Sequence, residues 1–102
     1  MLQYDKANLN KLKKMAELAP AAMKAYNDFS AAAMADGAIP AKYKELIAIA
    51  VAVTTQCPYC IDFHATSAKK LGVTDQEIAE AALVAAALRA GGSMTHATHA
   101  IG

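Results

Sequence analysis

The chain has 102 residues, which is the size of one domain. Ten Lys and Arg residues against nine Asp and Glu residues leave a net charge of +1, and no basic block indicates nucleic-acid binding. Hydrophobic residues make up 56% of the chain, aromatic residues only 6%, and most of the apolar excess is alanine. Because alanine is the best helix former, the composition predicts an all-α protein. A chain of this size has too small a core to bury so much apolar surface. We therefore expect that surface to be buried against further copies of the chain.

Proline and glycine divide the sequence into helical segments, and we find no alternating strand pattern and no internal repeat. Pro20, Pro40 and Pro58 suit the first turns of helices, while Gly37 and Gly72 suit helix ends. Helices are predicted at about 8–18, 20–36, 40–54, 57–71 and 75–90. The predicted fold is therefore an antiparallel bundle of about five to six helices, in which the tail forms any sixth.

Two of these helices carry further signals. The third contains the run Leu46 to Val53, which is apolar all round and therefore predicted to be buried on every face. Thr74 and Glu77 form the pattern of a capping box at the start of the fifth helix. That helix is expected to stop at Gly91-Gly92.

Nothing in the sequence predicts a membrane protein. The longest apolar run falls far short of the roughly 20 residues needed to span a bilayer. The N-terminal segment MLQYDKANLNKLKK lacks the apolar stretch of a signal peptide. We therefore expect a cytoplasmic protein, in which a close cysteine pair is catalytic, redox-sensing or metal-binding rather than a permanent staple.

The segment CPYCIDFH holds the most reactive side chains of the chain. Cys57 and Cys60 are three residues apart at a helix start, and His64 follows Cys60 by four, so all three share one face. Two thiols at this spacing can close a disulfide. The unpaired N–H groups and dipole of a helix N-terminus stabilise a thiolate, and an imidazole nearby can take its proton.

Glu45 is expected to join this group. A connection of about two residues predicts that the third and fourth helices form an antiparallel hairpin. Glu45 lies about ten residues before the turn and His64 about seven after it, so at ~1.5 Å per residue they stand within about one helical turn. The sequence thus predicts a proton relay of Glu45 and His64 beside the thiols.

Other interpretations of these residues stay open. A C-x-x-C pair alone also suits a helical core. Zinc could take Cys57, Cys60 and His64 with His96 or His99 as a fourth ligand, although three ligands from one short stretch are unusual. A thioredoxin fold needs strands around the motif, and haem attachment needs His directly after the second cysteine. Tyr59 is expected to pack, or to line the site with its hydroxyl.

These residues together resemble the alkyl hydroperoxidase D-like branch of the carboxymuconolactone decarboxylase family. The resemblance rests on Glu45, then Cys57-Pro58-Tyr59-Cys60, then His64, and continues from Gly72 to Gly92. It implies antiparallel helices assembled as trimers or, for a short single-motif chain, as hexamers. It also implies that Cys60 is the reactive thiol and Cys57 the resolving one. The best-studied type has a further histidine at the position of Tyr59, so the relay here is shorter.

The sequence therefore predicts a thiol-dependent antioxidant enzyme that reduces hydroperoxides or the disulfide of a peroxiredoxin-type partner, with catalytic residues Cys60, Cys57, His64 and Glu45. This chemistry requires neither a cofactor nor a metal. One alternative is a decarboxylase-like lyase acting on a small lactone. Such an enzyme would need cationic groups that converge on a carboxylate, and Arg89 is the only arginine of the chain. The other is a non-enzymatic zinc-binding or redox-sensing module.

Overall fold

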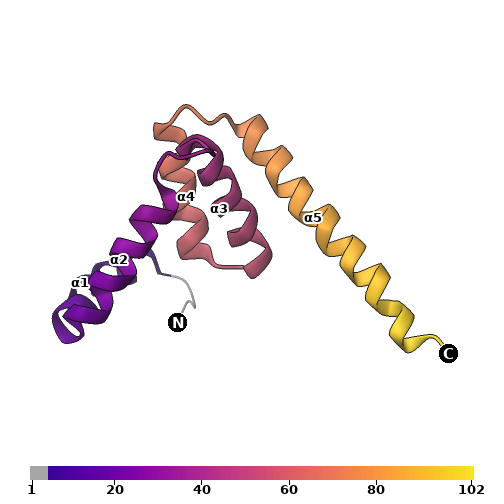
Figure 1. Ribbon diagram of the computed structural model, residues 1–102, viewed down its shortest axis with the longest axis horizontal. Coiled ribbons are helices and arrows are strands. Elements are labelled where there is room, and N and C mark those ends of the chain that lie inside the picture. Colours follow the sequence, from indigo (N-terminus) through magenta and orange to yellow (C-terminus); the bar gives the residue numbers. More distant parts are fainter. Residues whose placement is uncertain (1–4) are drawn as a thin grey trace. The chain divides into compact units, whose positions relative to one another are not determined.

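A computed structural model describes residues 5–102 of the chain, except for the side chain of Lys6. The described part is all-α, which confirms the predicted class, and contains no strand (Figure 1). Its elements are the 3-10 helix η1 (Lys6–Asn10), α1 (Lys11–Leu18), α2 (Pro20–Met34), α3 (Ala41–Thr55), α4 (Pro58–Lys70), α5 (Asp75–Ala97) and the 3-10 turn η2 (Thr98–Ala100). The contacts divide into two compact units, residues 1–41 and 42–102. The prediction of one domain stays a prediction.

The first unit is a pair of helices joined at one residue. Ala19 separates α1 from α2, and Pro20 occupies the first turn of α2, where its missing N–H costs nothing. The Asp5 carboxylate accepts a hydrogen bond from the Ala7 N–H and so caps η1. No residue of α1 or α2 is fully buried. Leu18 and Phe29 are examples of large apolar side chains left exposed here.

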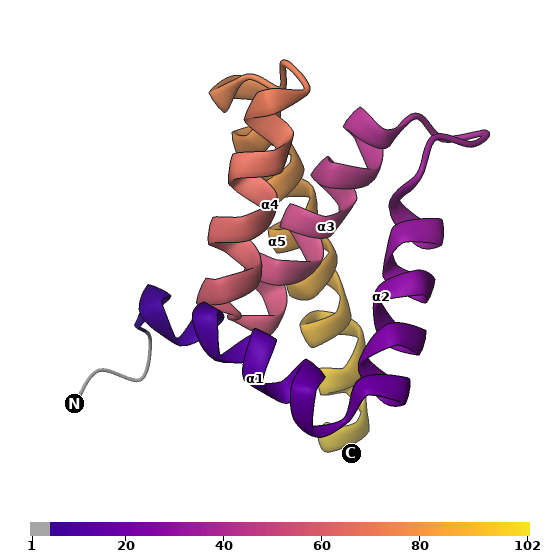
Figure 2. The same cartoon turned by 90° about the vertical axis from the view of Figure 1, so that its left-hand side faces the viewer.

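The second unit is built on the predicted hairpin of α3 and α4, which lie side by side in both views (Figures 1 and 2). Its core is small and joins the two helices with the start of α5. The buried members are Ile49, Ala68 and Val73, with Leu46, Val53 and Ile78 packed against them. This core fixes the rotation of α3 against α4, and with it the side chains that meet between them.

Both turns of this unit end a helix with a left-handed residue. Gly72 has φ +82° after α4, and the Val73 N–H bonds back to the Ala68 carbonyl at 3.1 Å. Gln56 has φ +56° after α3, and the Cys57 N–H bonds to the Ala52 carbonyl at 3.1 Å. For a residue other than glycine this conformation costs about 1–2 kcal/mol. The chain thus holds a strained residue directly before the first cysteine.

A capping box stabilises the start of α5, and an ion pair joins it to α3. The capping box is present as predicted, with the Thr74 hydroxyl accepting from the Glu77 N–H at 3.1 Å and the Glu77 carboxylate accepting from the Thr74 N–H at 2.9 Å. Lys42 of α3 lies 3.5 Å from the same carboxylate. The Thr74 N–H above all, and then Lys42, lower the pKa of Glu77. This support is therefore present at neutral pH and is lost as the pH falls through that lowered pKa.

Two helix ends and the buried face of one helix differ from the sequence predictions. The helix α2 ends at Met34 rather than at Gly37, because the Asp36 carboxylate caps the next helix by accepting from the Ala41 N–H. The helix α3 buries one face only, with Ile49 inside and Val51 exposed, since a single chain offers neighbours on one side.

None of the helices described in residues 5–102 has the length and hydropathy of a membrane span.

The third difference is that α5 continues through Gly91-Gly92 to Ala97. Among the described residues, the only glycine with positive φ is Gly72, so neither Gly91 nor Gly92 adopts the left-handed conformation that ends a helix. Glycine weakens a helix without forbidding it. The 3-10 turn η2 then follows directly, which matches the expected short helical tail.

This continuation has a measurable consequence for stability. A Cβ added at Gly91 or at Gly72 meets no atom within 4 Å, so only the backbone conformation distinguishes the two positions. Gly91→Ala should raise the free energy of unfolding by about 0.5–1 kcal/mol, because alanine favours a helix interior. Gly72→Ala should lower it by about 1 kcal/mol, because φ there is positive. Urea unfolding of both variants in one redox state tests this. Destabilisation by Gly91→Ala would indicate that the helix ends at Gly91-Gly92, as the sequence predicted.

Candidate active site

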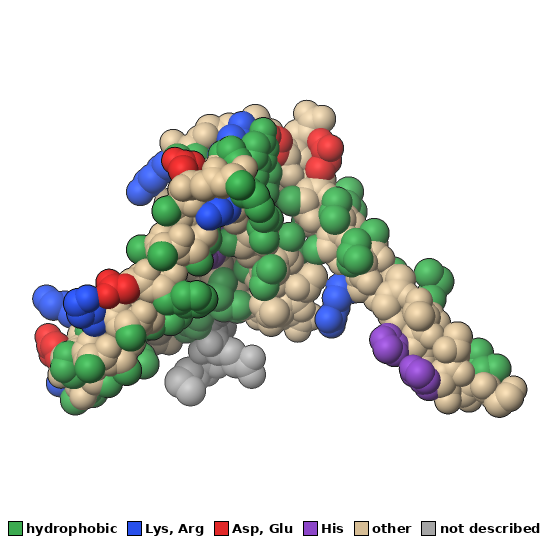
Figure 3. Space-filling view, viewed as in Figure 1, with side chains coloured by type: hydrophobic (Ala, Val, Ile, Leu, Met, Phe, Trp, Pro, Cys, Tyr) green, Lys and Arg blue, Asp and Glu red, His purple; other side chains and the backbone are tan. Residues whose placement is uncertain are grey.

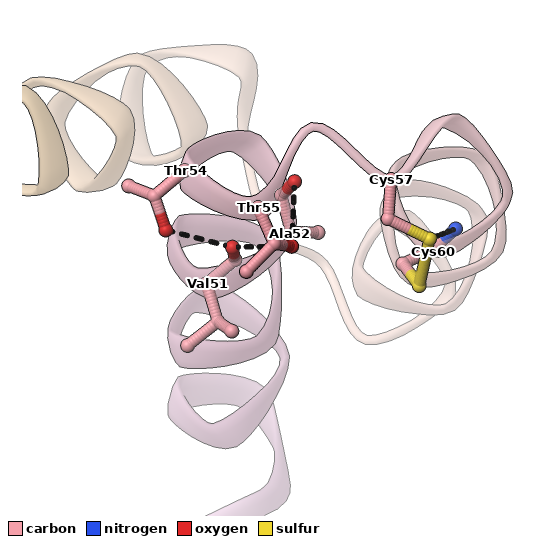
Figure 4. The surroundings of a disulfide bond; sticks show 6 residues. All are labelled: Val51, Ala52, Thr54, Thr55, Cys57 and Cys60. Carbon is pink, nitrogen blue, oxygen red and sulfur yellow. Dashed lines mark hydrogen bonds between the residues drawn. A yellow bond between two sulfur atoms is a disulfide. The ribbon is translucent and has the colours of Figure 1, made fainter.

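The two cysteines lie at the N-terminus of α4 and are joined in a disulfide, as their spacing allows (Figure 4). Cys57 is the N-cap residue, and its sulfur accepts from the Cys60 N–H at 3.2 Å. Pro58 occupies the first helical position, where no N–H is needed. The Cys57 sulfur thus takes the place of the oxygen of a usual N-cap side chain. A negative charge on this sulfur would be stabilised by that N–H and by the helix dipole.

The end of α3 holds the cysteine turn in place. The hydroxyls of Thr54 and Thr55 donate to the Val51 carbonyl at 2.8 and 3.0 Å, as the dashed lines in Figure 4 show. These bonds tie the last two side chains of α3 back to a carbonyl one turn earlier in the same helix. The Cys57 N–H itself bonds to the Ala52 carbonyl of α3, and the Cys57 sulfur accepts from the Cys60 N–H of α4. The backbone position of Cys57 does not depend on the disulfide alone.

Glu45 and His64 meet across the hairpin as predicted. Glu45 lies in α3 and His64 in α4, and Nδ1 of His64 is 2.8 Å from Oε2 of Glu45. Their side chains are 11% and 23% exposed respectively, and Glu45 is the buried charged residue of the described chain. When Glu45 is ionised it can only accept, so Nδ1 carries the proton and Nε2 of a neutral ring keeps a lone pair. The pair is therefore arranged to pass a proton through Nε2.

The disulfide and His64, the α4 member of the Glu45–His64 pair, lie close together along the chain. Cys60 and His64 are four residues apart within this helix and hence neighbours on its surface. Cys60 is exposed, whereas Cys57 is half-buried. An external reagent can therefore reach Cys60 more easily than Cys57. Tyr59 is half-buried in the first turn of the same helix.

Two features of the site escaped the sequence prediction. The Phe63 ring contacts His64 edge-to-face, with ring centroids 5.2 Å apart and planes at 82°. Adjacent residues of a helix are not expected to face each other, so spacing gave no signal for this contact. The left-handed conformation of Gln56 was also missed, because glycine is the usual residue in such a turn.

The two C-terminal histidines do not join this site. In the part of the chain that the structure describes, no three or more His, Cys, Asp and Glu side chains are grouped so as to hold a metal ion. His96 and His99 instead lie against each other at the end of α5 and in η2. The fourth ligand that the zinc interpretation requires is therefore not brought to the cysteines.

Comparison with known proteins places this arrangement in a family. The sequence pattern of the carboxymuconolactone decarboxylase family matches residues 20–101, a range that includes Glu45, both cysteines and His64. The chain belongs to the carboxymuconolactone decarboxylase family. A family member from Legionella pneumophila, solved as a crystal structure, is 38% identical and has a TM-score of 0.79, covering 91% of this chain and 83% of that one.

Two further proteins extend the comparison. A crystal structure from Methanobacterium thermoautotrophicum is 34% identical with a TM-score of 0.81, and covers 86% of this chain and 99% of that one. The protein called uncharacterized protein 4 in cox locus, from Paracoccus denitrificans, is 46% identical over 76% of this chain and 69% of its own length. The carboxymuconolactone decarboxylase family contains both decarboxylases and alkyl hydroperoxidase D-like members. The choice of reaction therefore depends on the site residues of this chain.

Proposed function

We propose that this family member is a thiol-dependent oxidoreductase that reduces hydroperoxides or the disulfide of a peroxiredoxin-type partner, in the cytoplasm. The observation that carries the proposal is the Cys57–Cys60 disulfide at a helix N-terminus, with the Glu45–His64 pair one turn along the same hairpin. A redox-active cysteine pair needs groups that exchange two electrons and groups that accept and donate protons. The cysteines supply the first and the carboxylate–imidazole pair supplies the second.

The first step of the proposed reaction starts from the reduced protein. His64, held by Glu45, removes the proton of the Cys60 thiol, and the thiolate attacks one oxygen of the hydroperoxide. An S–O bond forms, the O–O bond breaks, and the departing alkoxide takes the proton from His64 to become an alcohol. Cys60 is thereby oxidised to a sulfenic acid.

The second step closes the disulfide. The Cys57 thiolate attacks the Cys60 sulfur, the S–O bond breaks, and the hydroxide leaves as water after protonation. A dithiol then returns two electrons by attacking the sulfur of the exposed Cys60 residue, which expels Cys57 as a thiolate. The Cys60 N–H that bonds the Cys57 sulfur at 3.2 Å favours Cys57 as that leaving group. For a disulfide substrate, Cys60 attacks a sulfur of the partner in place of the peroxide oxygen.

A direct assay separates this function from the alternatives. Fully reduced protein should consume hydroperoxides in a stopped-flow experiment and turn over when dithiothreitol supplies electrons, because the dithiol regenerates both thiols. A lactone decarboxylase would release carbon dioxide and ignore peroxide. A zinc module would retain stoichiometric zinc and leave both peroxide and lactone unchanged.

We also propose that the protein works as a homo-oligomer, most simply a hexamer. In α5, large apolar side chains such as Leu83, Leu88 and Met94 are 68%, 70% and 72% exposed. Ala85 is the one buried residue of this helix. A helix gains most of its stability in a protein by packing an apolar face, and this one also contains two glycines. Further copies of the chain would cover this apolar face.

Sedimentation equilibrium at micromolar concentration should therefore give a mass several times the 10.6 kDa of one chain. A trimer would retain the packing argument and change only the number of copies. A clean monomer of 10.6 kDa would contradict it. In that case the exposed face of α5 would have no partner in the pure protein.

A further inference from the structure

The end of α5 carries a second pair of chemically active side chains, separate from the thiol site. His96 is in the last turn of α5, and His99 lies three residues on in the 3-10 turn η2. Both are exposed, and their ring centroids are 5.3 Å apart with the planes tilted by 32°. Figure 3 shows two histidine side chains side by side near the end of this helix. Neither ring has a role in the proposed reaction.

The local backbone explains why the two rings lie close together. In an α-helix, residues three apart are displaced around the axis, whereas in a 3-10 helix they eclipse. The chain changes from α to 3-10 between these two histidines. The Thr98 N–H bonds back toward the carbonyls of Thr95 and His96 at this change, and the Thr98 hydroxyl donates to the Thr95 carbonyl at 2.7 Å. The tightened turn therefore brings the two imidazoles close together.

We propose that His96 and His99 form a two-ligand site for a divalent transition-metal ion, with Zn²⁺ as the best-fitting ion and water completing the shell. Imidazole nitrogens bind Zn²⁺ at about 2.0–2.1 Å in tetrahedral geometry. Two imidazoles on one such ion would have ring centroids about 5 Å apart, by the same bond length and angle. The observed separation of 5.3 Å is close to this value.

The charges around the pair also favour a cation. The site is at the C-terminal end of a 23-residue helix, where the helix dipole is negative. The nearest cationic side chain along the helix is Arg89, seven residues before His96 and thus about 10 Å away along the axis. The negative helix end and the distance of Arg89 along α5 therefore favour a divalent ion at the imidazole nitrogens.

The test is a zinc titration of the oxidised protein by isothermal calorimetry. The disulfide leaves no thiolate at Cys57 or Cys60 to compete for the metal. We expect saturable binding in the unaltered chain and a loss of affinity of at least about tenfold in His96→Gln and in His99→Gln, since each removes one of two metal bonds. The matched control is His64→Gln, which should bind zinc as the unaltered protein does.

A second readout identifies the ligands directly. Zinc should shift the imidazole NMR signals of His96 and His99 and leave those of His64 in place, while the helical circular dichroism of all variants stays unchanged. The proposal is overturned if His64→Gln abolishes binding, or if either C-terminal variant binds zinc as tightly as the unaltered chain. Because the titration uses oxidised protein and measures no turnover, its result is independent of the proposed peroxidase reaction.

Discussion

After peroxide treatment, Cys57→Ser should carry a sulfenic acid on Cys60, whereas Cys60→Ser should carry little on Cys57. Without a resolving thiol, the oxidised Cys60 has no partner and persists long enough to be trapped. Without the attacking thiol, no rapid oxidation takes place. Peroxide consumption should fall to the background rate in Cys60→Ser, which is the largest effect we expect of any substitution.

Two physical effects oppose each other in this prediction. Cys57 is the N-cap, and its sulfur receives the Cys60 N–H and the full helix dipole. The dipole contributes ~0.3–1 kcal/mol at an exposed end, which is less than one pKa unit at ~1.36 kcal/mol per unit. Cys60 has His64 one turn away and is more exposed to the reagent. An adjacent base that removes the proton during attack can outweigh the dipole.

Dimedone labelling followed by mass spectrometry of each variant decides between them. Ser has the same shape as Cys and lacks the redox-active sulfur, and because both variants make the same change, each serves as the control for the other. Labelling on Cys57 in Cys60→Ser, with none on Cys60 in Cys57→Ser, would exchange the two roles. It would show that the helix terminus dominates over the imidazole.

Glu45→Gln should lower the rates of peroxide consumption and thiol alkylation by about 100-fold, the lower end of the range for general acid–base catalysis. The carboxylate holds the Nδ1 proton of His64 from 2.8 Å and stabilises the ring when it becomes charged. An amide oxygen can accept the same hydrogen bond but cannot balance the positive charge. The fall in stability should therefore be small, about 1 kcal/mol, because the bond is weakened rather than lost.

The control for this variant is Glu80→Gln, which makes the same chemical change at an exposed position on α5. It should alter neither the rate nor the stability. Both variants are compared by alkylation rate across pH and by urea unfolding. Equal alkylation rates in Glu45→Gln and the unaltered protein would make Glu45 a structural partner of His64 without a part in proton transfer.

The sequence alone predicted most of what depends on a few neighbouring residues. The all-α class, the α3–α4 hairpin, the capping box at Thr74 and the cysteine pair at a helix start are each confirmed. Capping and helix propensity act within about one turn, so they can be recognised from local sequence. The level of Glu45 beside His64 followed in the same way, from residue rise and a short turn.

The tertiary structure decided what depends on helix rotation and on competing ends. Glu45 and His64 are 19 residues apart, and packing of Ile49 against Ala68 and Val73 turns the two side chains toward each other. The left-handed Gln56 is fixed by the bond from Cys57 to α3, which overrides the residue's own preference. Gly91 is helical in the folded chain, although a glycine permits either conformation and its presence alone therefore did not decide where α5 ends. Sequence patterns state what each segment favours, but only the contacts of the folded chain select among conformations of similar energy.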